Sequence, residues 1–155
     1  MVDAIIKEDI EQINRSIDPE PFRRVVSRFI RQSLRREGLT VFGDGSQTRS
    51  FCYITNSIVG ILLFVAGASF AGIVLNIGHP NDTRIRDLME KTVQLSSSNS
   101  RLTFEAFPPG YHRRRLPAIS RARKLINWKA HVDLERGLRK SIELAIHLDL
   151  KNDIP

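Results

Sequence analysis

Apolar residues recur at helical spacing in the first part of the sequence. Isoleucines at positions 6, 10, 13 and 17 predict an amphipathic helix that packs on the rest of the protein or on a partner. A second apolar face predicts another helix over residues 22–37, and it consists of Val26, Phe29, Ile30 and Leu34. The opposite face of this second helix carries arginines at positions 24, 28, 31 and 35.

Three more helices are predicted in the second half, over residues 83–95, 119–127 and 134–148. Thr83 is expected to cap the first, which turns Ile85, Leu88 and Met89 inward. Asp133 is expected to cap the last, whose predicted buried face consists of Leu134, Leu138, Ile142, Ala145 and Ile146. Between them, residues 97–100 predict a loop, and residues 102–107 alternate as a strand does.

Residues 39–51, which read LTVFGDGSQTRSF, are the most informative stretch of the chain. A short apolar run leads into a Gly-Asp-Gly turn, and Gln47 and Arg49 follow two positions apart. In an extended segment this spacing points both side chains to one face. An amide and a guanidinium on one face are suited to hold a ribose and a phosphate together.

This stretch resembles the nucleotide-sugar segment of the extended short-chain dehydrogenase/reductases, and most closely that of the UDP-glucuronate decarboxylases. Four more segments carry the resemblance in the same order. The first two are RVVSRFI from Arg24 and VLNIGHP from Val74. The last two are the arginine and proline run HRRRLP from His112, followed by the helix that leads to Trp128, and LERGL from Leu134. The resemblance runs from about Asp18 to the C-terminus, so residues 1–17 form an extra helix outside it and residues 18–155 one substrate-binding domain.

The resemblance implies an α/β fold, namely a helix-rich α+β substrate subdomain with few short strands and without the Rossmann half. In that fold the strands near Val41 and Thr103 pair with each other. The strand near Val74 completes the nucleotide-binding sheet, which is absent here. An unpaired apolar strand invites association, so we expect a homodimer or an NAD-binding partner chain to cover it.

The motifs that bind and use NAD in these enzymes do not occur in the sequence. The family carries G-x-x-G-x-x-G at the NAD pyrophosphate and a Y-x-x-x-K pair for proton transfer. The nearest match here starts at Tyr111 and ends at Arg115, whose guanidinium cannot be tuned as a lysine amine can. We therefore expect no cofactor bound by this chain, no catalytic residues and no turnover by the chain alone.

The resemblance also implies the residues of a UDP-sugar site. Arg49, from the Q-T-R motif, and Arg115, from the arginine and proline run, would bind the diphosphate. Gln47 would lie near the ribose. The base would be surrounded by Val26, Phe29, Val41 and Phe42.

Several positions depart from the family pattern near this expected site. Ala118 stands where the family has an aspartate, which removes a helix cap and costs about 1 kcal/mol. Asn56 replaces an acidic residue, Arg23 replaces a glycine, and Arg28 replaces an asparagine. The residues around the expected sugar-nucleotide pocket therefore differ from those of the family at several positions, and binding depends on this altered pocket.

Residues 58–77, from Ile58 to Ile77, contain no charge and are long enough to span a bilayer as one helix. Three glycines and the β-branched run that starts at Ile73 argue against a single helix. The family resemblance divides the segment into a helix over 57–65, a turn over 67–72 and a strand over 73–77. We follow this division and expect no membrane span, and the apolar helix surface would suit a subunit interface.

The net charge of +7 raises the question of a nucleic-acid partner. The arginine face of residues 24–35 could track a phosphate backbone, but no nucleic-acid-binding module accompanies it and aromatic residues make up only 7% of the chain. We expect a solvated face instead. The single cysteine, Cys52, excludes an internal disulfide and fits a reduced cytoplasm, and the acidic N-terminus does not read as a signal peptide.

The spacing of the histidines does not predict a catalytic or metal site of their own. They are scattered at positions 79, 112, 131 and 147, without the spacing of a metal site, so no metal is expected. Three hypotheses remain from the sequence. The chain is a UDP-sugar-binding module, a remnant or interaction protein that keeps only the fold, or a basic nucleic-acid-binding protein.

Overall fold

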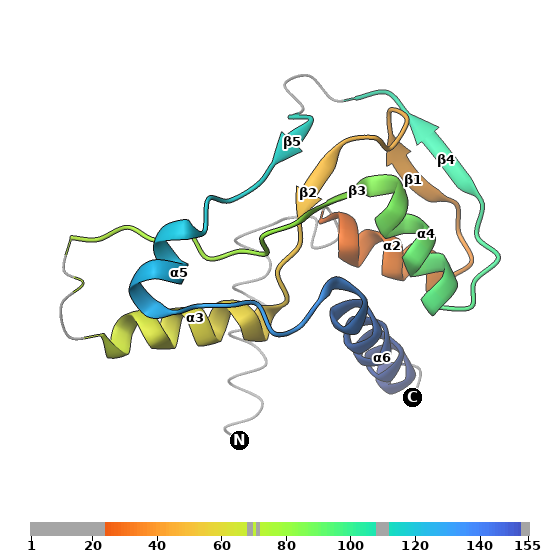
Figure 1. The fold of residues 1–155 in the computed structure, drawn as a ribbon. Helices are drawn as coiled ribbons and strands as arrows, with labels where there is room; N and C mark the ends of the chain where they lie inside the picture. The colour runs from red at the N-terminus through yellow and green to blue at the C-terminus, as the bar shows by residue number, and fades with distance from the viewer. Residues whose placement is uncertain (1–23, 68–69, 71, 108–111, 153–155) are drawn as a thin grey trace.

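The computed structural model describes residues 24–67, 70, 72–107 and 112–152. The predicted N-terminal helix of residues 1–17 and the turn that follows residue 107 lie outside these residues. The described chain is an α/β structure with few short strands, as predicted (Figure 1). Its elements are α2 (Val25–Leu34), β1 (Leu39–Phe42), β2 (Thr48–Ser50), α3 (Ile54–Ala66), β3 (Asp82–Arg84), α4 (Ile85–Leu95), β4 (Leu102–Glu105), β5 (Arg114–Arg115), α5 (Ser120–Ile126) and α6 (Leu134–Asn152).

The strands form two small sheets. β1 and β4 pair in parallel, with Val41 opposite Phe104, which confirms the predicted pairing. The second sheet has the order β3-β2-β5, in which β3 is antiparallel and β5 is parallel to β2. Thr83 lies in β3 opposite Arg49, so our assignment of Thr83 as a helix cap is wrong. The residue before α4 is Arg84, whose side chain makes no capping hydrogen bond.

The larger hydrophobic cluster lies where α2, α4 and α6 gather beside β1 (Figure 1). The apolar faces predicted for these helices meet here, because each helix can bury its stripe only against its neighbours. Phe29, Leu39 and Leu88 are completely buried at its centre. Ile85 and Met89 are also buried, as predicted for α4.

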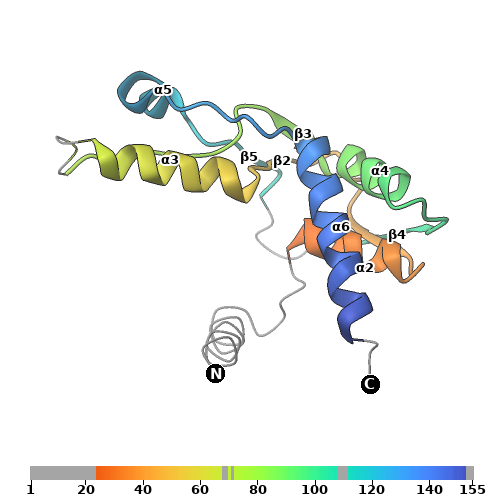
Figure 2. The ribbon, with the colours of Figure 1, turned by 90° about the horizontal axis from the view of Figure 1, so that it is seen from below.

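The smaller cluster joins α3 to α5 at the other end of the molecule, and Figure 2 shows these two helices side by side. Trp128 is completely buried at its centre, packed with Ile119, Ala122 and Ile126. Gly60 of α3 lies against this tryptophan so closely that an added Cβ would be 2.7 Å from the indole Nε1. The small residue is therefore needed for the close approach of α3 to Trp128.

The apolar segment of residues 58–77 is divided, as predicted, since α3 ends at Ala66 and Gly67 follows in an extended conformation. No helix among the described residues is long and apolar enough to cross a membrane. The predicted strand over residues 73–77 is not formed. The segment pairs with no strand among the described residues, because the sheet that would give it a neighbour is not present.

α6 begins as predicted, since the backbone N–H of Arg136 donates to Oδ1 of Asp133 over 2.8 Å. Leu138 and Ile142 are buried along it, but Ile146 is 42% exposed, so our assignment of Ile146 to the buried face is wrong. α6 runs on past its neighbouring elements (Figure 2), and no element of the described residues covers Ile146.

Candidate functional site

The structure brings the two predicted diphosphate-binding arginines together. β2 and β5 are parallel neighbours, and their register places Arg49 directly opposite Arg115. Residues opposite each other in adjacent strands point to the same face of a sheet. Two guanidinium groups that are distant in sequence therefore share one face of the β3-β2-β5 sheet.

Both arginines line one cleft of about 630 Å³. The cleft lies between the β2-β5 pair and the extended segment that leads to Gly78. Its remaining lining residues are Ser50, Cys52, Ile77, Arg114, Leu116 and Pro117. Three cationic side chains at one cleft make it suited to a polyanionic group.

The guanidinium of Arg49 is held by main-chain carbonyl groups. Its Nη1 donates to the oxygen of Thr48 over 2.7 Å, and its Nη2 donates to the oxygen of His112. These bonds orient the half-buried Arg49 side chain along the two strands. Arg115, by contrast, is exposed at the surface of the cleft.

Asp82 fastens the strands that carry the two arginines. Its Oδ2 accepts hydrogen bonds from Nε of Arg114 and from Oγ1 of Thr48, each over 2.8 Å. The bond from Arg114, and then that from Thr48, lowers the pKa of the Asp82 carboxyl below its ordinary value of 3.8. One carboxylate of β3 thus binds residues next to Arg115 and Arg49 and fixes their register. Sequence reasoning missed this role.

Gln47 does not reach the cleft. Its side chain is 3% exposed, and its Nε2 donates to the main-chain oxygen of Phe42 over 2.9 Å. Its own main-chain oxygen accepts from the N–H of Ile85 over 2.9 Å. Gln47 therefore fixes the turn between β1 and β2 against the start of α4.

The four residues predicted around the base are not brought to the cleft either. Phe29 and Val41 are buried in the larger cluster, at 0% and 1% exposure. Val26 lines a neighbouring cavity of about 460 Å³ at the starts of α2 and α6, which shares Ser50 and Cys52 with the cleft. The ring of Phe42 is covered by the guanidinium of Arg28, 5.0 Å from its centroid. In this arrangement Phe29 of α2 and Val41 of β1 belong to the hydrophobic core.

Arg28 also corrects our view of the arginine face as fully solvated. Its Nη2 donates to the main-chain oxygen of Thr40 over 3.0 Å, and both Arg28 and Arg31 are half-buried. A guanidinium stacked on an aromatic ring and bonded to a carbonyl group is part of the fold. Only Arg24 and Arg35 of this face are exposed.

The glycines of the Gly-Asp-Gly turn do not form a cradle for the NAD pyrophosphate. Gly43 and Gly45 have φ of +59° and +76°, which explains their identity. A Cβ at Gly43 would lie 2.1 Å from the ring of Phe107, and one at Gly45 would lie 3.0 Å from Cβ of Arg86. Since the chain's own side chains occupy the space above both glycines, the described residues do not fit NAD here.

The described part of the chain holds no group of three or more side chains able to ligate a metal ion. Ser50, which lines the cleft, donates its hydroxyl to the main-chain oxygen of His79 over 2.7 Å. The cleft thus offers cationic and hydrogen-bonding groups of the kind that suit an anion.

The sequence matches a known protein family. The model of the NAD dependent epimerase/dehydratase family matches residues 15–78. UDP-glucuronic acid decarboxylase 3 of Arabidopsis thaliana is 37% identical over 115 residues, which are 74% of this chain and 33% of that protein. UDP-glucuronic acid decarboxylase 1 of Danio rerio is 37% identical over 120 residues, 77% of this chain and 28% of that protein. The chain thus spans about a third of the length of the curated relatives it matches.

Solved structures share the fold. The UDP-glucuronic acid 4-epimerase from Bacillus cereus, in complex with UDP-glucuronic acid and NAD, matches with a TM-score of 0.77 and 30% identity, over 82% of this chain and 41% of that chain. The UDP-glucose 4-epimerase of Thermotoga maritima, with UDP-glucose, matches with a TM-score of 0.78 and 24% identity, over 84% of this chain and 42% of that chain.

Sequence and fold point to the same group of proteins. The family match covers α2, β1, β2 and α3, and the relatives extend the likeness over most of the chain. The fold neighbours are nucleotide-sugar epimerases with the same mixture of helices and short strands. This chain belongs to the NAD dependent epimerase/dehydratase family, within the extended short-chain dehydrogenase/reductases, and is similar to the UDP-glucuronic acid decarboxylases.

Proposed function

We propose that this chain binds the diphosphate of a UDP-sugar, of the UDP-glucuronate or UDP-xylose type, between Arg49 and Arg115. It would serve as the substrate-binding part of a nucleotide-sugar decarboxylase, epimerase or dehydratase. The observation that carries the proposal is the register of β2 against β5, which sets the two arginines opposite each other at one cleft.

The chemistry of the cleft supports a diphosphate. A guanidinium presents parallel N–H donors that match two oxygens of a phosphate, and two guanidiniums can hold two phosphates. Each charge-assisted bond contributes roughly 1.5 to 3 kcal/mol. The structural neighbour from Bacillus cereus was solved with UDP-glucuronic acid, which carries such a diphosphate, and this supports the class of ligand.

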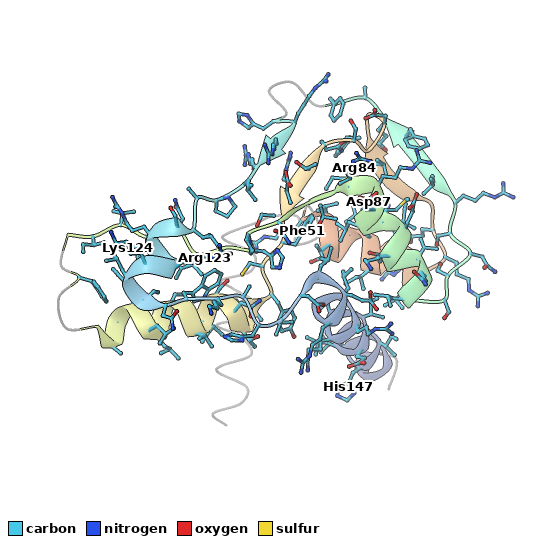
Figure 3. The ribbon with its side chains drawn as sticks, in the orientation of Figure 1. Phe51, Arg84, Asp87, Arg123, Lys124 and His147 are labelled. Atoms are coloured by element: carbon cyan, nitrogen blue, oxygen red, sulfur yellow. The ribbon has the colours of Figure 1, made fainter. Side chains whose placement is uncertain are left out.

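Calorimetric titration of the purified chain with UDP, UDP-glucuronate and UDP-xylose tests the proposal. Arg49→Ala and Arg115→Ala should each weaken binding about 10- to 150-fold, which corresponds to the loss of one charged contact. Arg123→Ala, which removes an exposed arginine of α5 that does not line the cleft, is the control and should leave the affinity unchanged (Figure 3). Absence of heat with all three ligands would reject the binding function.

A remnant that keeps only the fold is the second candidate. It is favoured by the contacts of Arg49, whose guanidinium bonds the carbonyl groups of Thr48 and His112. If these bonds are stronger than those to a phosphate, the arginine will not turn to a ligand. The titration separates the two candidates, because a remnant gives no heat while remaining folded by circular dichroism.

We also propose that this chain binds no NAD and needs a companion to complete the chemistry. The crowded glycine turn of residues 43–45 supports the first part. The second is supported by a broad apolar surface on α3, where Ile58, Leu62 and Val65 are exposed, next to the unpaired residues 73–77. An NAD-binding chain or a second copy would cover this surface. We place the protein in the cytoplasm, which imaging of a fluorescent fusion would test.

A further inference from the structure

An apolar groove runs between α2 and α6, and it shares no lining residue with the arginine cleft. It encloses about 460 Å³. Val26, Ile30 and Leu34 line it from α2. Ser141, Leu144, Ala145 and Leu148 line it from α6. Leu144 and Leu148 are 58% and 51% exposed, so this groove presents large apolar side chains to whatever binds there.

The groove has a cationic rim. Arg31 and Arg35 lie one helical turn apart on α2 and belong to its lining. An occupant that suits this surface carries an apolar stripe flanked by acidic side chains, since opposite charges at the edge of a groove favour association and fix its direction.

The N-terminal segment of this chain has that composition. Residues 1–22 contain six acidic and two basic side chains, a net charge of −4 in a chain whose total is +7. Isoleucines 6, 10, 13 and 17 predict one apolar stripe on a helix. Asp3 and Asp9 would flank this stripe at about 60° on either side, given 100° per residue. The family match starts at residue 15, so most of this segment lies outside it.

The segment is long enough to cover α2. Residues 4–17 as a helix would be about 21 Å long, and α2 with its 10 residues is about 15 Å long. Pro19 and Pro21 interrupt a helix, so residues 18–23 form a link that spans at most about 20 Å. The link ends at the start of α2, where the groove begins with Val26. A helix that turns back from this point runs antiparallel to α2, which brings one edge of the stripe, with its aspartate, alongside Arg31 and Arg35.

We propose that residues 4–17 bind as an amphipathic helix in the groove between α2 and α6 of the same chain. The isoleucine stripe packs on Ile30, Leu34 and Leu144, and one acidic edge of the helix faces the cationic rim. This docking adds a fourth helix to the larger hydrophobic cluster. It is independent of sugar-nucleotide binding, because the groove and the arginine cleft share no lining residue.

Paramagnetic relaxation in the full-length chain tests this placement. A nitroxide is attached at His147→Cys, beside the groove on α6, with Cys52 replaced by serine. The matched control carries the label at Lys124→Cys on α5, at the far end of the molecule (Figure 3). We expect the amide signals of residues 4–17 to broaden with the label on α6 and to remain sharp with the label on α5.

Two substitutions test the isoleucine stripe. Ile10→Asp places a charge on the stripe and should abolish the broadening, whereas Gln12→Asp makes the same charge change on the opposite face and should keep it. Equal broadening from both labels, no broadening from either, or equal loss in both variants would overturn the proposal. A mixture of isotope-labelled chain with separately spin-labelled chain reports contact between copies. Broadening seen in that mixture would assign the groove to a second copy and would also overturn it.

Discussion

Trp128 donates its Nε1 hydrogen to the main-chain oxygen of Asn56 over 3.0 Å, and both residues are buried. The Asn56 side chain completes the contact. Its Oδ1 accepts from the N–H groups of His131 and Val132 over 3.0 Å each, and its Nδ2 donates to the oxygen of Val132 over 2.8 Å. The first turn of α3 is thus bonded to the chain that follows α5. Asn56, which we expected near the substrate pocket, holds the smaller cluster together instead.

Asn56→Ala should destabilise the protein by about 2 to 4 kcal/mol, because it removes three hydrogen bonds of a buried side chain and leaves two N–H groups and one carbonyl group of residues 131–132 without this partner. Urea unfolding followed by circular dichroism measures the change. Asn76→Ala is the matched control, since Asn76 is exposed and makes one long bond of 3.4 Å to Ala118. It should change the stability by less than about 0.5 kcal/mol. Equal effects of the two substitutions would show that the Asn56 bonds do not stabilise the fold.

Gly60→Ala should be destabilising although alanine is the better helix former. The new methyl group would lie 2.7 Å from Nε1 of Trp128 and 2.8 Å from Cδ1 of Ile77. Overpacking costs about 1 to 3 kcal/mol, and the gain in helix propensity of about 1 kcal/mol offsets only part of it.

Gly137→Ala in α6 is the comparison for this substitution, because its Cβ would meet only the Tyr53 side chain at 3.0 Å. We expect it to change the unfolding free energy by less than about 1 kcal/mol. Thermal unfolding of both variants gives the answer. A Gly60→Ala variant as stable as the wild type would mean that the tryptophan moves aside without cost.

Asp82→Asn should destabilise the protein in a manner that depends on pH. The pKa of Asp82 is lowered in the folded state by Arg114 and Thr48. A lowered pKa means that the charged form stabilises the fold above the ordinary value of 3.8, and that this contribution is lost as the pH falls through the folded value. The difference in urea midpoint between wild type and variant should therefore be present at about pH 7 and shrink near pH 3. A difference that stays constant with pH would contradict a role for the carboxylate charge.

Leu62→Glu should reduce association of the chain with itself or with an NAD-binding partner. Leu62 is 62% exposed on the apolar surface of α3, so a carboxylate there would have to be buried unpaired in any interface. Light scattering during size-exclusion chromatography, over a range of concentrations, measures the assembly. Gln94→Glu, at an exposed position of α4, is the control and should leave the assembly unchanged. If both variants assemble like the wild type, α3 is not the contact surface.

The helices could be predicted because their apolar periods are strong and local. Phe29, Leu88 and Leu138 are buried where the helical spacing puts them. The strand over residues 73–77 was predicted wrongly because a strand depends on a neighbour that the sequence does not display. Ile146 was misplaced for a related reason. The period identifies one face of α6, but it does not tell how far along the helix that face is covered.

The paired arginines were predicted only through the family resemblance, since no local rule brings Arg49 next to Arg115. Parallel pairing of distant strands leaves no sequence pattern of its own. The same holds for Asp82, whose carboxylate joins Thr48 and Arg114 across two strand pairs. Gln47 and Phe42 show a different limit of sequence-based prediction. The extended spacing indicates on which face of a strand a side chain lies. It does not indicate whether the neighbouring turn folds that side chain into the interior.

The parallel pairing of β2 with β5 has a consequence for biosynthesis. Arg49 and the carbonyl group of His112 that it bonds are 63 positions apart. At roughly 5 to 20 residues per second, the ribosome reaches His112 about 3 to 13 s after it has added Arg49. During that interval β2 has no strand on one side, while the apolar α3 has already emerged. The nascent chain is therefore most exposed to misassembly between the synthesis of α3 and that of β5, and chaperones would act in this window.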